Sequence, residues 1–170
     1  MAMETPVFYY DVGSPWCWLA GERVHEVLGV VPVWQPALAA GPEEVDRAAV
    51  ERATAEQGLP QPRWPDGFPF DSELAMRAAT FAKQTGRAVA FSLAAMRQAF
   101  AAGRDLSVSD NVLIAAAACE LHPRAVLAGV ETRTVRDALP TAHSLGIERL
   151  PAIRVDGRLV QGPDAPELAA

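Results

Sequence analysis

Two short segments near opposite ends of the chain constrain its fold more than any other feature of the sequence. The first, Phe-Tyr-Tyr-Asp-Val-Gly-Ser-Pro-Trp-Cys-Trp-Leu over residues 8–19, is typical of an apolar strand that runs into a helix. The second, Gly-Ile-Glu-Arg-Leu-Pro-Ala-Ile-Arg-Val-Asp-Gly over residues 146–157, is typical of a loop that enters a strand. Its final Asp-Gly predicts a tight hairpin between strands 152–155 and 159–161, because such a turn requires positive φ angles.

The N-terminal segment predicts a strand–helix–strand unit. Residues 6–11 are aromatic and β-branched, which suits a buried strand. Ser14 stands where a helix N-cap belongs, and Pro15 fits the first helical position. An apolar helical face follows, Gly29 is a suitable stop, and residues 30–35 predict a second strand. The unit has the length of a crossover between parallel strands.

The middle of the chain predicts helices. A proline-rich and aromatic loop over residues 58–70 interrupts them, and Pro140 is expected to break the last one because proline lacks the amide proton of a helix interior. The predicted helices cover residues 42–57, 72–84, a second helix after Gly86 that extends to residue 102, 108–121, a short stretch from Pro123, and 132–145. We therefore predict an α/β part formed by residues 1–38 and 146–170, with an all-helical insertion over residues 39–145.

The composition excludes several classes of protein. The chain has 170 residues, half of them hydrophobic, which favours one domain with a substantial core. No apolar run reaches the ~18 residues of a membrane span, and no basic segment precedes an apolar stretch at the N-terminus. The formal charge of −6 argues against nucleic-acid binding. Cys17, Cys119 and three dispersed histidines have no metal-ligand spacing, so we expect no metal site, and we expect a reduced, cytoplasmic protein.

Ser14 and Cys17 are the candidate catalytic residues. A helix N-terminus presents free amides and the positive end of the helix dipole, which stabilise a thiolate or another anion. Pairs of cysteines at this spacing carry out thiol–disulfide exchange, but a serine hydroxyl has no redox chemistry, so we expect no dithiol cycle here. The Ser14 hydroxyl can donate a hydrogen bond to a thiolate that a ligand brings. The alternatives are that Ser14 is only an N-cap and that Cys17 is a small buried hydrophobic residue.

Leu150-Pro151 is the second candidate element. A cis peptide bond at this strand entrance would turn the Leu150 backbone outward, where it could pair with an extended ligand. The alternative is an ordinary trans proline at the start of a strand. We predict the cis form.

Taken together, these motifs resemble the DsbA-like branch of the thioredoxin superfamily. The sequence is most similar to the group that contains 2-hydroxychromene-2-carboxylate isomerase and kappa-class glutathione transferase. The segments that carry this resemblance are residues 8–11 with 14–16, residues 68–72 leading into 75–78, Leu150-Pro151, and the Gly-Pro-Asp corner at 162–164. The resemblance implies a thioredoxin-like α/β fold with an all-helical insertion.

The resemblance also implies a glutathione site. It assigns the glutathione sulfur to Ser14, the glutathione backbone to Leu150 beside Pro151, and the γ-glutamyl amino group to Asp164. Pro15 and Trp16 are expected to line a hydrophobic substrate slot beside Ser14. The alternative for Asp164 is a helix N-cap.

Three features depart from the family pattern. Cys17 stands where isomerase-like members often have a small or hydroxyl residue. Residues 36–68 contain no lysine, so the sequence offers no lysine in that segment for a ligand contact. The chain also ends soon after the 162–164 corner, where the family continues into a fuller helix.

We therefore predict glutathione-dependent isomerase or transferase chemistry on a small hydrophobic or aromatic substrate. One alternative is a DsbA-like thiol–disulfide oxidoreductase that uses Cys17. Another is a non-catalytic module that holds an extended peptide along Leu150-Pro151. The apolar helical block is compatible with a homodimer.

Overall fold

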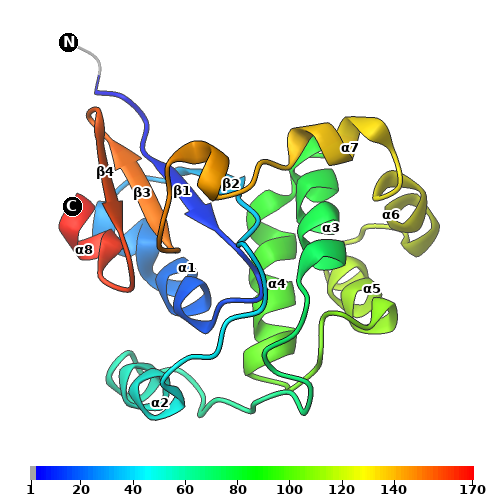
Figure 1. Ribbon diagram of the computed structural model, residues 1–170, viewed down its shortest axis with the longest axis horizontal. Helices are drawn as coiled ribbons and strands as arrows, with labels where there is room; N and C mark the ends of the chain where they lie inside the picture. The colour runs from blue at the N-terminus through cyan, green and yellow to red at the C-terminus, as the bar shows by residue number, and fades with distance from the viewer. Residues whose placement is uncertain (1–2) are drawn as a thin grey trace.

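A four-stranded sheet forms the centre of the α/β part. The computed structural model describes residues 3–170, and the strand order is β2-β1-β3-β4 (Figure 1). The strands are β1 (Val7–Tyr10), β2 (Val33–Pro36), β3 (Ala152–Val155) and β4 (Arg158–Gln161). β1 is parallel to β2 and antiparallel to β3, and β3 is antiparallel to β4. The two ends of the chain therefore build one sheet, as the sequence predicted.

Helix α1 (Pro15–Leu28) makes the crossover between the two parallel strands. It packs against α8 (Ala165–Ala169), which also contacts β3, so both helices lie on one face of the sheet (Figure 1). The other face carries a smaller core around Tyr9, Ala142 and Ile147. Because successive side chains of a strand point to opposite faces, Phe8 and Tyr10 enter the main core while Tyr9 enters the smaller one.

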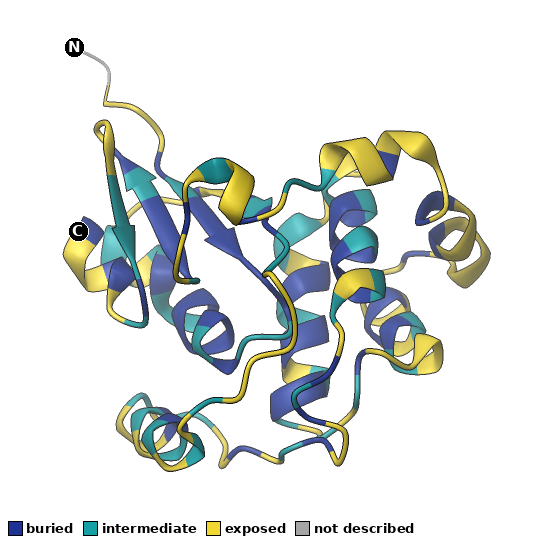
Figure 2. Ribbon diagram, viewed as in Figure 1, coloured by how far each residue is buried: buried dark blue, intermediate teal, exposed yellow. Residues whose placement is uncertain are grey.

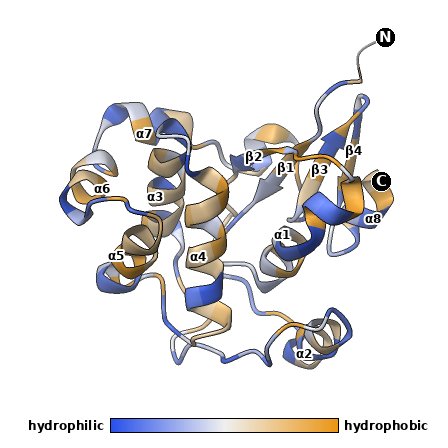
Figure 3. Cartoon of the chain, turned by 180° about the vertical axis from the view of Figure 1, so that it is seen from behind, coloured by the Kyte–Doolittle hydropathy of each residue, from blue (hydrophilic) through white to orange (hydrophobic). Residues whose placement is uncertain are grey.

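The remaining helices lie between β2 and β3 in the sequence. They are α2 (Arg47–Glu56), α3 (Glu73–Gln84), α4 (Ala88–Phe100), α5 (Ser109–Ala118), α6 (Pro123–Gly129), α7 (Arg133–Ala138) and the 3₁₀ helix η1 (His143–Leu145). Helix α4 contacts α1, α3 and α5, and Figure 3 shows it in mainly apolar colours. In Figure 2, β1 has mainly the buried colour inside the sheet, whereas α7 is mainly exposed. No helix among the described residues is long and apolar enough to cross a membrane.

One continuous core joins the sheet to the helical block. The Tyr10 hydroxyl and the Ser92 hydroxyl, on β1 and α4, form a buried hydrogen bond of 2.6 Å. Trp18 of α1 stacks on Phe100 of α4 at 6.1 Å between ring centroids. The helical block therefore shares its packing with the α/β part and fixes the position of α1.

The helix predicted over residues 42–57 is shorter than expected. Helix α2 begins only at Arg47, because the Asp46 carboxylate supplies the N-cap by accepting a 3.1 Å hydrogen bond from the Ala49 amide. The expectation that Pro42 occupies the first turn is therefore wrong. Residues 40–44 are instead an exposed loop.

Three further predictions meet different outcomes. Ser72 occupies the N-cap position of α3, but its side chain makes no cap hydrogen bond and donates to Asp11 instead. The break expected at Pro140 is confirmed, because α7 ends at Ala138. The hairpin turn is confirmed as well, with positive φ angles of 48° at Asp156 and 74° at Gly157.

Candidate functional site

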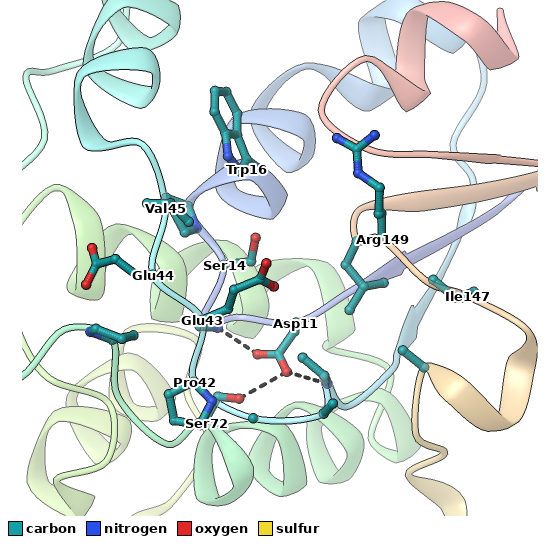
Figure 4. Close-up of a pocket in the computed structure, with 18 of the residues that line it drawn as sticks. Asp11, Ser14, Trp16, Pro42, Glu43, Glu44, Val45, Ser72, Ile147 and Arg149 are labelled. Atoms are coloured by element: carbon teal, nitrogen blue, oxygen red, sulfur yellow. Dashed lines mark hydrogen bonds between the residues drawn. The ribbon is translucent and has the colours of Figure 1, made fainter.

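A cleft of about 700 Å³ lies at the N-terminal end of α1. Its walls come from residues 11–16, the β2–α2 loop over residues 39–45, residues 69–72, and residues 142–150 before β3 (Figure 4). The cleft therefore lies between the two segments that the sequence singled out.

Ser14 lies at the start of α1 and lines this cleft. Its backbone is extended, with φ −102° and ψ 120°, and its Oγ accepts a 3.2 Å hydrogen bond from the Cys17 amide. Pro15 takes the first helical position and also lines the cleft. The N-cap prediction is confirmed, and a hydroxyl that accepts one hydrogen bond can still donate its proton to a ligand.

Cys17 points away from the cleft into the core. Its side chain is fully buried and is not part of the cleft wall. Burial raises the pKa of its thiol to about 12, which outweighs the lowering by the Asp11 backbone and the Ser14 side chain. Cys17 is therefore a neutral thiol at pH 7, although it lies in the first turn of a helix.

Leu150 belongs to the segment before β3 that forms another wall of the cleft. Leu150 lines the cleft, and the Leu150-Pro151 peptide bond is cis, as predicted. The Pro151 carbonyl is already paired, since it accepts a 2.8 Å hydrogen bond from the Gly162 amide. Across residues 3–170, by contrast, no hydrogen bond is formed by the Leu150 amide or carbonyl. The Leu150 backbone is available to an extended ligand.

Asp11 is a site residue that the sequence analysis missed. One carboxylate oxygen accepts from the Gly13 amide (2.8 Å), and the other accepts from the Ala39 amide (2.9 Å) and the Ser72 hydroxyl (3.0 Å) (Figure 4). Burial raises the pKa of Asp11, and these three hydrogen bonds lower it by less. The buried carboxyl therefore ties together three segments of the cleft wall. The available signal was a carboxylate at the last position of a strand predicted to be buried.

The comparisons with known proteins agree with this architecture. The family model of the DSBA-like thioredoxin domain matches residues 6–170. The chain belongs to this family. None of the curated proteins compared matches it in sequence.

Solved structures of DsbA-like proteins share the fold. A 2-hydroxychromene-2-carboxylate isomerase is similar with a TM-score of 0.79 and 13% identity, covering 95% of this chain and 90% of that one. The cytosolic disulfide reductase DsbM from Pseudomonas aeruginosa is similar with a TM-score of 0.63 and 22% identity, covering 97% and 96%. A thioredoxin-like oxidoreductase from Silicibacter pomeroyi DSS-3 has a TM-score of 0.60 and 22% identity, covering 93% and 77%. At these identities the likeness establishes the DsbA-like fold.

In this DsbA-like chain, Asp164 is not brought into the cleft. It occupies the N-cap position of α8, but its side chain is exposed and makes no cap hydrogen bond. Its neighbour Pro163 does line the cleft. Arg23 of α1 fixes this corner by donating to the Pro163 carbonyl at 2.7 Å and pairing with Glu167 of α8 at 2.6 Å.

The charged side chains of the cleft are distributed unevenly. Glu43 and Glu44 lie on the β2–α2 loop, and Asp11 lies below them (Figure 4). Arg149 extends from the opposite wall, beside Glu148 and next to Leu150 in the chain. The sequence analysis noted that residues 36–68 lack lysine, but it did not identify Arg149 as the cation that another segment supplies.

Proposed function

We propose that this chain is a glutathione-dependent enzyme of the DsbA-like family, an isomerase or transferase that acts on a small hydrophobic or aromatic substrate. One observation carries the proposal. Ser14 and Leu150, whose backbone is unpaired, both line the 700 Å³ cleft, while Cys17 is buried outside it. This arrangement can hold the thiol of a peptide-like ligand but offers no protein thiol for exchange.

In the proposed mechanism the ligand thiol lies at the N-terminus of α1. There Ser14 donates a hydrogen bond to the sulfur, and the first-turn amides of α1 that have no intrahelical partner lie at the same helix end. Both stabilise the thiolate after its proton has left. The thiol proton passes to solvent, and the thiolate attacks an electrophilic carbon of the second substrate and forms a carbon–sulfur bond. In a substitution the leaving group departs with the electron pair of the bond that breaks. In an addition to a double bond, the π electron pair moves onto the neighbouring atom, which takes up a proton. A transferase releases this adduct, and an isomerase breaks the same bond after rearrangement and regenerates the thiolate.

The remaining walls of the cleft suit the two ligands. The Leu150 amide and carbonyl can pair with the peptide backbone of glutathione in the manner of an added strand. Trp16, half-buried at the edge of the cleft, gives a flat apolar surface for an aromatic substrate. Among the structural neighbours, one is an isomerase for 2-hydroxychromene-2-carboxylate and DsbM has been solved with GSH, which supports the substrate class.

Titration calorimetry with reduced glutathione tests this function. We expect wild-type protein to bind glutathione and to lower its thiol pKa, followed by the ultraviolet absorbance of the thiolate. Ser14→Ala should reduce the pKa effect more than the affinity. A charge-assisted hydrogen bond to the thiolate contributes about twice the ~1 kcal/mol of a neutral one.

Ser109→Ala is the matched control, because Ser109 is exposed at the start of α5 and its side chain makes no hydrogen bond there. It should leave both the affinity and the thiol pKa unchanged. Absence of binding at millimolar glutathione would refute the isomerase or transferase function.

The disulfide oxidoreductase alternative depends on Cys17. A thiol with a pKa of about 12 and no exposed surface is a poor nucleophile, and Ser14 cannot take the other half of a dithiol cycle. We expect no insulin reduction above a Cys17→Ser control. Ser14→Cys should create activity, because it places a half-buried thiol in the cleft one helical turn before Cys17. Activity of the wild-type protein in this assay would favour the alternative.

A further inference from the structure

Arg149 is held in place at its main chain. Its amide donates a 3.0 Å hydrogen bond to the Gln161 side-chain oxygen, and the Glu148 amide donates to the same oxygen at 2.7 Å. Gln161 is the last residue of β4, so the hairpin fixes the segment that enters the cleft. This bonding determines where the Arg149 side chain leaves the backbone.

The far end of the Arg149 side chain returns to the backbone just after β4. It lies against the Cα of Gly162, so close that a Cβ built on that glycine would stand 3.1 Å from Cζ and 3.2–3.3 Å from both terminal nitrogens. Gly162 has a φ of 97°, which L side chains rarely adopt. A glycine at this position therefore gives the flat guanidinium group a surface on which to rest.

The charge of this guanidinium is not neutralised by the protein. Of the residues in the described part of the chain that line the cleft, Arg149 is the sole lysine or arginine. No carboxylate within residues 3–170 forms an ion pair with it. Glu43 and Glu44 lie on a different wall, so the cleft is negative at the β2–α2 loop and positive at Arg149 (Figure 4).

We propose that Arg149 is the specificity-determining residue of the cleft and binds a carboxylate of the thiol ligand. The inference rests on the proposed function, because it takes Ser14 as the position of the sulfur and Leu150 as the partner of the peptide backbone. Arg149 precedes Leu150, so a carboxylate next to the paired peptide unit meets the guanidinium. A planar guanidinium matches a carboxylate with two parallel hydrogen bonds. The acidic β2–α2 loop repels the ligand carboxylate at the opposite end of the cleft.

Two consequences follow for selectivity. The cleft should prefer peptide-like thiols that carry a carboxylate over neutral or cationic thiols of similar size. The orientation of the ligand is also fixed, since its anionic end points to Arg149 and its sulfur points to Ser14. The second substrate then approaches from the side of Trp16.

S-methylglutathione is the probe for this role, because its blocked sulfur removes the thiolate from the measurement. We expect Arg149→Gln to weaken its binding roughly ten-fold or more, as loss of a charge-assisted contact does. Arg149→Lys should restore part of the affinity, because lysine keeps the charge without the planar fork. Arg158→Gln is the matched control, since Arg158 is exposed at the start of β4 and is not part of the cleft wall.

Two ligand analogues identify the carboxylate. The glycine ethyl ester of S-methylglutathione lacks the glycine charge, and the 4-aminobutanoyl analogue lacks the γ-glutamyl α-carboxylate. For one of these analogues, the affinity for wild-type protein should be as low as the affinity of Arg149→Gln for S-methylglutathione. The affinity of Arg149→Gln for that same analogue should be no lower.

The two proposals fail in different ways. If S-methylglutathione binds equally to wild-type protein and Arg149→Gln, the role of Arg149 is overturned while the proposed function stands. If neither S-methylglutathione nor reduced glutathione binds wild-type protein, both are overturned. Loss of binding in Arg158→Gln as well would show an effect of overall charge and would overturn the specific contact.

Discussion

The two walls of the cleft are built in different ways. The wall from Asp11 to Trp16 is continuous in sequence, and its hydrogen bonds include contacts between residues two and three apart, from Gly13 to Asp11 and from Cys17 to Ser14. The opposite wall depends on residues that are 12 and 13 apart, since Gln161 holds the amides of Arg149 and Glu148. One wall follows from helix-capping rules, whereas the other requires that the hairpin already be paired.

Because of this difference, the two walls offer a ligand different interactions. The first wall supplies a neutral hydroxyl and free amides at a helix end, which accommodate an anion of any kind. The second wall supplies a fixed cation and an unpaired backbone, which distinguish one ligand from another. Substitutions that damage each wall separately therefore test whether general anion stabilisation and ligand selection are distinct properties.

Asp11→Ala should have the largest effect, because it removes the junction of the first wall. It leaves the amides of Gly13 and Ala39 and the hydroxyl of Ser72 without their acceptor. We expect the free energy of unfolding to fall by about 3 kcal/mol, since each unsatisfied buried group costs roughly 1–3 kcal/mol. Chemical denaturation measures this loss. The control Asp71→Ala removes an exposed carboxylate that accepts one hydrogen bond from a nearby amide, and it should lower the free energy of unfolding by less than about 1 kcal/mol. Equal losses in the two variants would contradict the role of Asp11 as the junction of the wall.

Gly162→Ala should have the next largest effect and acts on the second wall. Its φ of 97° is strained for alanine, and the new methyl group meets the Arg149 guanidinium. We expect a loss of about 2 kcal/mol, within the 1–3 kcal/mol of such strain. The affinity for S-methylglutathione should fall as well.

Gly146→Ala separates backbone strain from displacement of Arg149. Gly146 also has positive φ, at 73°, but a Cβ there has open space. We expect it to cost about 1 kcal/mol without changing affinity. If the two glycine variants lose the same stability and the same affinity for S-methylglutathione, the position of the Arg149 guanidinium does not depend on Gly162.

The sequence predicted the first wall better than the second for a physical reason. The Ser14 cap, Pro15 at the first turn and the left-handed stop at Gly29 depend on a few neighbouring residues, so their signals are local. The Asp156-Gly157 turn is local too. These predictions are confirmed because no distant residue has to agree with them.

The residues that the sequence analysis missed gain their roles from tertiary packing. Asp11 is the junction only because Ala39 and Ser72 come to it from other elements. Arg149 faces the cleft only because Gln161 and Gly162 hold it. Asp164 stays outside the cleft wall, whereas the adjacent Pro163 lines the cleft. The family resemblance predicted the fold, but it did not identify these contacts.

Asp11 also predicts a pH dependence of stability. Its pKa is raised from 3.8 in the folded protein, mainly by burial, so the folded state binds the proton more tightly than the unfolded state. The contribution of Asp11 is therefore most favourable below pH 3.8 and is lost as the pH rises through the folded pKa. Each unit of pKa difference corresponds to about 1.4 kcal/mol.

Asp11→Asn isolates this effect, because asparagine does not titrate and other carboxylates cancel in the comparison. The stability of wild-type protein minus that of Asp11→Asn should decrease in urea denaturation as the pH rises from 3.8 through the raised pKa of the folded protein. A difference that increases with pH would mean that the three hydrogen bonds to Asp11 outweigh its burial.

Ser14→Ala should have the smallest effect and tests whether the two walls are independent. It removes the acceptor of the Cys17 amide, and loss of a serine N-cap costs about 1 kcal/mol. Ser14→Asn keeps a capping side chain and should remain within about 0.5 kcal/mol of wild type. Because the cap is local, its loss should add to that of Arg149→Gln without coupling when no ligand is bound. Coupling above about 0.5 kcal/mol in this double-mutant cycle would show that the walls already depend on each other in the free protein.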